Sequence, residues 1–297
     1  MRRRTFVRSA APIAAAIGAQ ARGSVPPFAS ERISVTTRGS GPDVILIPGL
    51  GSDRSVWDGL AAQLEGRFRL HLVRINGFAG EPAGANAQGE RVIAPFVEDL
   101  ADYIGAERLD RPAVIGHSLG GTAALMLGAR HPGLPGRLMV VDMVPFLAVV
   151  VAGPTATPEG VRPQADDLAA QMIKASPDAF ARQERAMIDS YTQTEAARPA
   201  LFKAAIDSDR VVMAHALREL MITDLGPELA RIGVPTTVVY AWNAAMPEAA
   251  EADATYRKAY AQLDGVDLVR IDDSRHFVMI DQPQRFGAAV EEFLAGR

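Results

Sequence analysis

Short runs of β-branched and other apolar residues alternate with longer stretches of helical spacing from about residue 33 onward. Such alternation is typical of a mostly parallel sheet with helices on both of its faces. Several runs are apolar almost throughout, as expected of strands that are buried on both sides. We therefore expect an α/β fold around one central sheet. The predicted strands are 33–37, 44–47, 70–75, 113–115, 138–141, 236–240 and 267–271.

Helices are expected between the strands, where apolar residues recur every three or four positions. One such set consists of Val92, Ile93, Phe96, Val97, Leu100, Tyr103 and Ile104. A second set, nearer the end of the chain, consists of Tyr256, Ala259, Tyr260 and Leu263. We interpret both sets as the buried sides of core-facing helices, and we assign no chemistry to them.

The alternation pauses between about residues 147 and 225, where Ala, Pro, Met and charged residues follow helical patterns. A segment of this length is too long for a simple loop. We interpret 147–225 as a helical cap inserted into an α/β core formed by 31–146 and 226–297. Methionines of the cap could line an apolar substrate cavity or pack the helices together. They are Met172, Met187, Met213 and Met221.

The first 30 residues have the order of an export signal followed by a linker. Arginines at 2–4 precede an apolar stretch at 10–19, and a small-residue cleavage site follows at 19–21. The arginine pair also resembles a twin-arginine signal. We expect a periplasmic or secreted protein; the alternative is a cytoplasmic one with a disordered basic tail. The apolar stretch is shorter than the roughly 20 residues that span a bilayer, so we expect no stable membrane insertion.

Composition narrows the classes of function. The 297 residues include 31 basic and 35 acidic ones, without the basic excess expected of a nucleic-acid-binding protein. There is no cysteine, which excludes disulfides, a thiol nucleophile and cysteine-ligated metal sites. No pattern implies a metal or an organic cofactor, and the oligomeric state stays open. Small-molecule chemistry is therefore the expectation.

The most specific pattern in the chain is Gly116-His117-Ser118-Leu119-Gly120, between the strand predicted at 113–115 and a helical run at 122–130. A serine at such a sharp turn is lifted above the sheet, and the flanking glycines avoid collisions with strand and helix. The helix that follows directs the positive end of its dipole to the same point. The pattern predicts that Ser118 is a nucleophile; a glycine-rich turn with an incidental serine is the alternative.

Together with motifs on either side, this pattern resembles the α/β-hydrolase family over about residues 33–294. Upstream, Gly49-Leu50-Gly51 follows a predicted strand as in the family's His-Gly-x motif, with Pro48 in place of the histidine. The resemblance implies that the backbone N–H groups of Leu50 and Leu119 form an oxyanion hole. Loss of one donor from a comparable hole lowers the rate by about 10²–10³-fold.

A serine hydroxyl needs a neighbouring base to take its proton, and the chain has five histidines. His71 lies within a strand, His131 ends a helix before a proline, and His215 belongs to the predicted cap. His117 is expected to point away from the serine, because side chains alternate along a strand. His276 remains, and its place after the last predicted strand resembles that of the family's catalytic histidine. A structural histidine at that position is the alternative.

The third member of the predicted triad is where the chain departs from the family. The family usually places an aspartate after the strand predicted at 236–240, but this chain has Asn243 in that region. An asparagine can orient the imidazole but cannot offset the charge of an imidazolium. Asp142 follows the strand at 138–141, where some members carry their acid, although it could instead be a loop or capping residue. Asp142, Asn243, and Glu248 or another acid are the alternatives.

These residues predict hydrolysis of a carboxylic ester or a related acyl compound through an acyl-enzyme on Ser118. The expected partner is a small or medium, uncharged acyl substrate under the helical cap. Lactones, thioesters, amides and carbon–carbon bonds next to a ketone are alternatives, because one fold hosts many reactions. A binding protein that keeps the pocket but has little turnover is the alternative from another class. Dehalogenases and epoxide hydrolases need an aspartate as nucleophile, and Ser118 argues against both.

Overall fold

The computed structural model of the chain describes residues 28–246 and 248–296. The predicted export signal therefore lies outside the described residues, apart from the last positions of its linker. Among the described helices, none combines the length and the apolar character that a membrane span requires.

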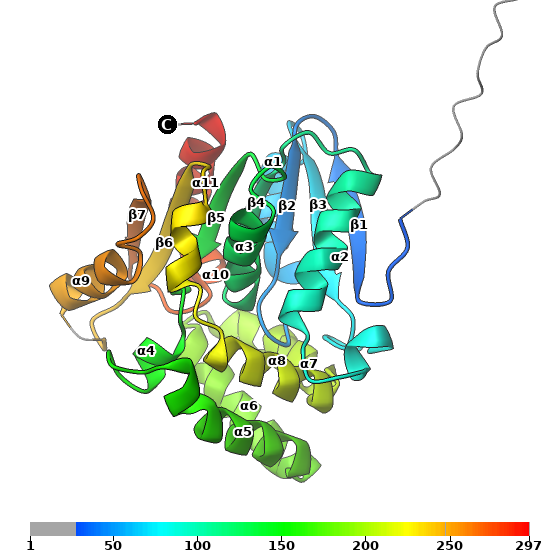
Figure 1. Cartoon of the computed structure of the whole chain (residues 1–297), viewed down its shortest axis with the longest axis vertical. Coiled ribbons are helices and arrows are strands. Elements are labelled where there is room, and N and C mark those ends of the chain that lie inside the picture. The colour runs from blue at the N-terminus through cyan, green and yellow to red at the C-terminus, as the bar shows by residue number, and fades with distance from the viewer. Residues whose placement is uncertain (1–27, 247, 297) are drawn as a thin grey trace, which may run out of the picture.

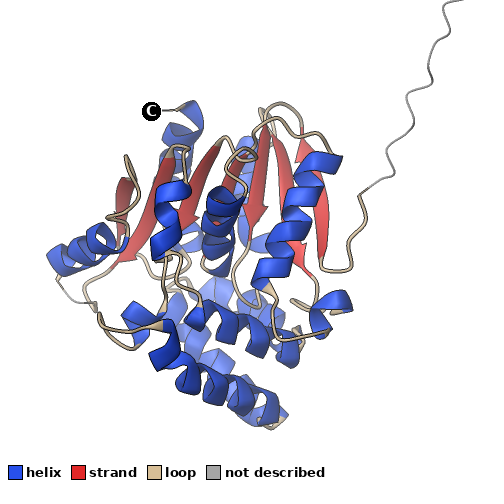
Figure 2. Ribbon diagram, viewed as in Figure 1, coloured by secondary structure: helices blue, strands red, loops and turns tan. Residues whose placement is uncertain are grey.

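In the described part of the chain, seven strands form one sheet with the order β1-β3-β2-β4-β5-β6-β7 (Figures 1 and 2). β1 is antiparallel to β3, and all other neighbouring strands are parallel. The strands are β1 (Ile33–Gly39), β2 (Asp43–Ile47), β3 (Arg69–Ile75), β4 (Ala113–His117), β5 (Arg137–Val141), β6 (Thr236–Trp242) and β7 (Asp267–Asp272). Each predicted strand is present, so the predicted α/β fold is confirmed.

Successive residues of each strand point to opposite faces of the sheet, and each face packs against its own helices. Ile45 and Leu46, neighbours in β2, belong to two different buried clusters. The first cluster includes α2 and α3, and the second includes α1 and α11. These helices and their neighbours are η1 (Arg54–Trp57), α1 (Asp58–Leu64), η2 (Gly84–Ala87), α2 (Ile93–Ala106), α3 (Leu119–Arg130), η4 (Gly226–Arg231), α9 (Ala249–Ala259), α10 (Val278–Asp281) and α11 (Pro283–Ala295).

Between β5 and β6 the chain forms a layer of helices at the carboxyl ends of the parallel strands, in the lower part of Figure 1. We call it the α4–α8 layer. α5 packs against α8, and α6 packs against α7. The layer contains α4 (Ala148–Val151), α5 (Pro158–Lys174), α6 (Pro177–Tyr191), η3 (Glu195–Ala197), α7 (Arg198–Asp207) and α8 (Arg210–Ile222).

Capping side chains mark where the helices of this layer begin. The Ser176 hydroxyl accepts a hydrogen bond from the N–H of Ala179 at the start of α6. At the start of α8, the Asp209 carboxylate accepts from the N–H groups of Val211 and Val212. Both residues satisfy N–H groups of a first helical turn, which have no acceptor within their own helix.

Glu219 connects the α4–α8 layer to the core. Its carboxylate is buried on α8 and accepts hydrogen bonds from three N–H groups at the start of α2. The donors are Val92, Ile93 and Ala94, at 2.6, 2.8 and 2.9 Å. A carboxylate at a helix amino terminus also interacts favourably with the helix dipole. α8 is thereby fixed against α2, and with it one side of the layer.

Candidate active site

Ser118 lies on the turn between β4 and α3, with φ of 54° and ψ of −119°. Few residues other than glycine adopt such a conformation, which is typical of strained functional turns. The Ser118 N–H donates to the carbonyl of Val141 at the end of β5. A Cβ atom on Gly116 would collide with the carbonyl of Gly120, and one on Gly120 would collide with that of Ile47. The glycines are therefore needed for the close approach of strand and helix, as predicted.

A cavity of about 520 Å³ lies between the carboxyl ends of the strands and the α4–α8 layer. Ser118 and His276 both line it, although they are far apart in the sequence. Val150 and Val151 of α4 also line it and are exposed to solvent, with exposed fractions of 59% and 53%. Three of the four methionines considered above belong to the lining, namely Met172, Met187 and Met213.

Asp142 orients the imidazole of His276. The distance from His276 Nδ1 to Asp142 Oδ2 is 2.7 Å. Because an ionised carboxylate only accepts hydrogen bonds, Nδ1 carries the proton and Nε2 keeps its free lone pair. Asp142 Oδ1 accepts from the N–H of Ala241 at 2.9 Å and from the hydroxyl of Tyr256 at 3.2 Å. Both carboxylate oxygens are thus held by donors from other parts of the chain.

Tyr256 is a polar contact of the site that the sequence pattern did not reveal. It belongs to α9, and its ring stacks on that of Tyr240 with centroids 4.1 Å apart. Burial, followed by the charge of Asp142, raises the pKa of the Tyr256 phenol well above its usual value. The hydroxyl therefore stays protonated at neutral pH and donates to Asp142. Helical spacing indicated a core-facing residue, and Tyr256 is partly buried against the core, but the spacing carries no information about the partner of the hydroxyl.

The other candidates for the third position have different surroundings. The Asn243 side chain donates to the carbonyl of Ser274 at 3.0 Å and accepts from the N–H of Ala245 at 3.0 Å. It thereby holds the loop after β6 against the loop that carries His276. Glu248 is exposed at the start of α9. Of the named alternatives, Asp142 is the residue that the structure places against the imidazole.

His117 was expected to point away from the serine, but it lies beside His276 and lines the same cavity as Ser118. The two ring centroids are 4.6 Å apart, and His117 Nε2 lies 3.0 Å from the carbonyl oxygen of His276. Side chains alternate only while a strand stays extended, and the chain turns sharply at Ser118. Burial, followed by the charge of His276, lowers the pKa of His117 well below its usual value. His117 is therefore neutral and supports the loop of His276 by donating from Nε2.

Leu50 and Leu119 lie at the positions that the family resemblance implied for an oxyanion hole. Leu50 follows β2 and lines the cavity next to Gly49. Leu119 directly follows Ser118 and is the first residue of α3. The N–H of a first helical residue has no acceptor within its helix, and the helix dipole favours negative charge there. The N–H of Leu119 is therefore a candidate to bind an anionic oxygen beside Ser118, and the family resemblance implies the N–H of Leu50 as the second donor.

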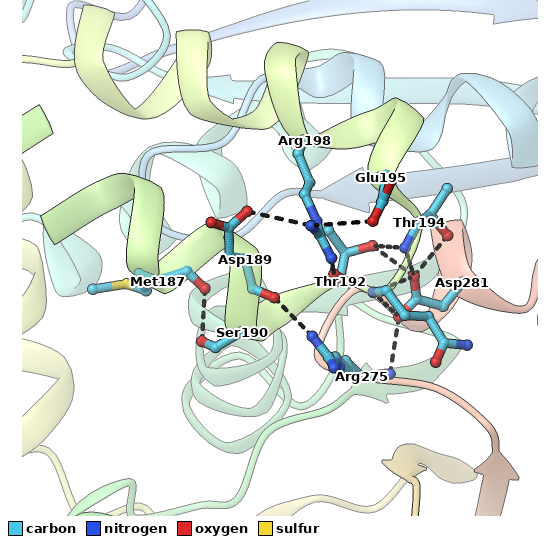
Figure 3. A network of polar contacts seen from close by, with 10 residues as sticks. Met187, Asp189, Ser190, Thr192, Thr194, Glu195, Arg198, Arg275 and Asp281 are labelled. Atoms are coloured by element: carbon cyan, nitrogen blue, oxygen red, sulfur yellow. Dashed lines mark hydrogen bonds and ion pairs between the residues drawn. The ribbon is translucent and has the colours of Figure 1, made fainter. Parts of the chain in front are cut away.

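The loop that carries His276 is held by a network centred on Asp281 of α10 (Figure 3). The Asp281 carboxylate accepts from the hydroxyl groups of Thr192 and Thr194 at 2.6 and 2.8 Å. It also accepts from the backbone N–H of Arg275 at 2.9 Å. Arg275 immediately precedes His276. One carboxylate therefore joins the imidazole's loop to the segment that follows α6.

Direct contacts join the same loop to the end of α6. The Arg275 guanidinium donates to the carbonyl of Asp189 at 2.7 Å (Figure 3), and the N–H of Phe277 donates to that of Tyr191 at 3.1 Å. The Tyr191 ring lies 4.7 Å from the His276 ring, measured between centroids. The end of α6 and the imidazole are thus held in a defined relative position.

The chain resembles known proteins over most of its length. The sequence model of the Alpha/beta hydrolase family matches residues 44–289. The pimeloyl-[acyl-carrier protein] methyl ester esterase of Aeromonas salmonicida is 27% identical over 274 residues, which cover 88% of this chain and 99% of that protein.

Two solved structures share the fold. The enol-lactonase from Burkholderia xenovorans LB400 has a TM-score of 0.72 at 21% identity, over 89% of this chain and 96% of that chain. An esterase from Exiguobacterium antarcticum has a TM-score of 0.74 at 17% identity, over 89% and 95% of the two chains.

Proposed function

The chain belongs to the alpha/beta hydrolase family, and on this basis we propose that it hydrolyses a carboxylic ester through an acyl-enzyme on Ser118. The observation that carries the proposal is the 2.7 Å contact between His276 Nδ1 and Asp142 Oδ2, beside a cavity that Ser118 also lines. An oriented imidazole and a serine on a strand-to-helix turn are what nucleophilic acyl transfer requires. The similarity to methyl ester esterases supports an ester as the cleaved bond.

Each residue has a defined role in the proposed reaction. His276 Nε2 takes the proton of the Ser118 hydroxyl while Oγ attacks the carbonyl carbon of the ester. The N–H groups of Leu50 and Leu119 bind the oxyanion, and Asp142 offsets the charge of the imidazolium. Collapse of the tetrahedral intermediate releases the alcohol, which leaves with the proton from His276. Water, activated by the same imidazole, then hydrolyses the acyl-enzyme and releases the acid.

In this proposal, residues 147–225 act as a cap over the reacting groups. Side chains of α5, α6, α7 and α8 form the roof of the cavity. Apolar walls suit a substrate whose acyl or alcohol part is uncharged, because burial of apolar surface is favourable. The cap therefore selects the substrate, while the residues at the ends of the strands carry out the reaction.

Hydrolysis of p-nitrophenyl esters of increasing chain length tests the proposal. We expect the wild type to hydrolyse at least one member of the series. Ser118→Ala should lower kcat by about 10⁴–10⁶-fold, because the nucleophile is lost. Ser55→Ala is the matched control, since Ser55 is an exposed serine on η1.

A fluorophosphonate probe separates a hydrolase from a protein that only binds its ligand. Labelling should occur in the wild type and in Ser55→Ala but not in Ser118→Ala. A wild type that is neither labelled nor active on any ester would overturn the proposed function.

Residues 1–30 are further proposed to direct export from the cytoplasm. The support is the order of arginines, apolar stretch and small residues in the sequence. Cell fractionation of the full chain checks this: recovery of the protein in the cytoplasm alone would contradict it.

A further inference from the structure

Glu184 is a buried acid that faces the cavity. It lies on α6, only 3% of its surface is exposed, and it is part of the cavity lining. Its Oε1 atom is buried and has no hydrogen-bond partner among the described residues. Buried carboxyl groups in proteins are normally paired or hydrogen-bonded, and each exception needs an explanation. A ligand that enters the cavity is one source of the missing partner.

The position of Glu184 relative to the reacting groups follows from the helix. Glu184, Met187, Ile188 and Tyr191 are spaced for one face of α6, and all four line the cavity. Tyr191 touches the ring of His276, and α6 is tied to the loop of that residue by the contacts described above. Seven residues of α-helix span about 10 Å. Glu184 therefore lies about 10 Å along the cavity from the end of α6 that contacts the imidazole.

The surroundings of Glu184 favour its neutral form. Helix α6 also contributes Met187 and Ile188 to the cavity lining, and helix α7, which packs against α6, contributes Leu201 and Ala205. The described residues that line the cavity include no lysine or arginine. Besides Glu184, the titratable side chains of the described cavity lining are His117, Asp142, Tyr191, Glu251, Tyr256 and His276.

Burial raises the pKa of the Glu184 carboxyl to about 7. At neutral pH and below, a large share of the group is therefore protonated. It then offers both an O–H donor and a carbonyl acceptor.

We propose that the Glu184 carboxyl binds an uncharged hydrogen-bonding group, such as a hydroxyl or an amide, carried by the acyl chain of the substrate away from the ester. This inference rests on the proposed ester hydrolysis and specifies its substrate class. A purely apolar chain would leave the buried carboxyl without a partner, and sites with buried polar groups discriminate strongly against such analogues. An ammonium group would lose its hydration in an apolar cavity for a single partner, which is unfavourable.

Matched pairs of p-nitrophenyl esters test this inference. In each pair, an ω-hydroxy acyl chain is compared with an unsubstituted chain in which a methyl group replaces the hydroxyl, as in ω-hydroxyoctanoate and nonanoate. Shorter and longer pairs vary the distance from the ester, and an ω-amino ester supplies a cation. The measured quantity is kcat/KM at about pH 6, below the raised pKa, where the carboxyl is mostly neutral.

Three variants accompany the wild type. Glu184→Gln keeps a donor and an acceptor at every pH, whereas Glu184→Met removes both with little change in volume. Asp178→Asn is the control, because Asp178 is an exposed acid in the first turn of the same helix.

We expect the wild type to prefer the hydroxy ester of at least one pair by about 10-fold or more. Glu184→Gln should retain that preference, Glu184→Met should abolish or reverse it, and Asp178→Asn should leave it unchanged. A wild type without preference at any chain length would overturn the inference even if no variant could be purified. The same preference in Glu184→Met, or a preference for the amino ester, would also overturn it.

Hydrolysis of p-nitrophenyl acetate keeps the two proposals apart, because its acyl group is too short to extend along α6. If the wild type cleaves the acetate and shows no preference within the pairs, only the role of Glu184 fails. If the acetate and all longer esters are left intact, the proposed function fails and this inference fails with it.

Discussion

Asp142 on the floor of the cavity and Glu184 on its roof are both acids that line the same space, but their surroundings differ. Both oxygens of Asp142 accept hydrogen bonds, from the imidazole of His276 and from two further donors. Glu184 has a buried oxygen without a partner among the described residues. The Asp142 carboxylate is held in one orientation before any substrate arrives. The Glu184 carboxyl gains its missing hydrogen-bond partner only from a ligand that enters the cavity.

Glu219 shows that buried acids of the α4–α8 layer do not in general lack hydrogen-bond partners. It also belongs to the α4–α8 layer and is also buried, yet its carboxylate accepts three backbone N–H groups. A buried acid with a full set of donors stabilises the fold or orients a neighbour, whereas one without donors weakens the fold. Substitutions of Asp142, Glu219 and Glu184 should therefore have different effects on activity and stability.

The largest effect is expected from Asp142→Asn. An asparagine would no longer offset the imidazolium and could present its amide to Nδ1, which favours the wrong tautomer of His276. We expect kcat on p-nitrophenyl butanoate to fall by about 10⁴-fold, the loss known for a comparable triad. The measurement is a steady-state rate, with thermal unfolding to verify that the variant is folded.

Asn243→Ala is the matched control for this prediction. Asn243 contacts Ser274 and Ala245, so its loss should lower kcat by less than about 10-fold. A larger loss from Asn243→Ala than from Asp142→Asn would reverse the assignment of the acid.

An intermediate effect, on stability, is expected from Glu219→Gln. The amide keeps one acceptor oxygen, but its NH₂ group faces N–H donors at the start of α2 and the negative charge is lost. We expect the free energy of unfolding to fall by about 2–3 kcal/mol. Urea unfolding followed by circular dichroism measures this value. An unchanged midpoint would mean that the three hydrogen bonds do not hold the layer to the core.

An effect on stability of similar size but opposite sign is expected from Glu184→Gln. The pKa of Glu184 is about 7 in the folded chain, against a usual value of 4.5. A raised carboxyl pKa means that the associated stability is fully present below about pH 4.5 and is lost as the pH rises through about 7. At about pH 8, the neutral glutamine should therefore raise the free energy of unfolding by about 3 kcal/mol.

Urea unfolding of the wild type and Glu184→Gln at several pH values measures this difference. The two proteins should have similar stability at about pH 4, where both side chains are neutral. A difference that does not grow between about pH 4.5 and 7 would show that Glu184 is not a destabilising acid.

Several parts of the site could be predicted from local sequence. Strands appear as apolar runs, and the turn at Ser118 is marked by glycines that the packing of β4, α3 and β2 requires. The positions of His276 and Asp142 after their strands were also available, because the carboxyl ends of parallel strands meet at one edge of a sheet. The partner of Tyr256, the contact of His117 with His276 and the place of Glu184 in the cavity lining were not predicted.

The sequence by itself determined the elements and their order, since alternation and helical spacing are local properties of neighbouring residues. Only the tertiary structure placed Asp142, and not Asn243, against His276, because this contact joins residues 134 positions apart. Only the tertiary structure also showed that Glu219 has hydrogen-bond donors and that Glu184 has a buried oxygen without one among the described residues, although both acids lie on helices of the α4–α8 layer. Whether a buried carboxyl finds donors depends on distances of a few ångströms across the fold, and no local pattern records them.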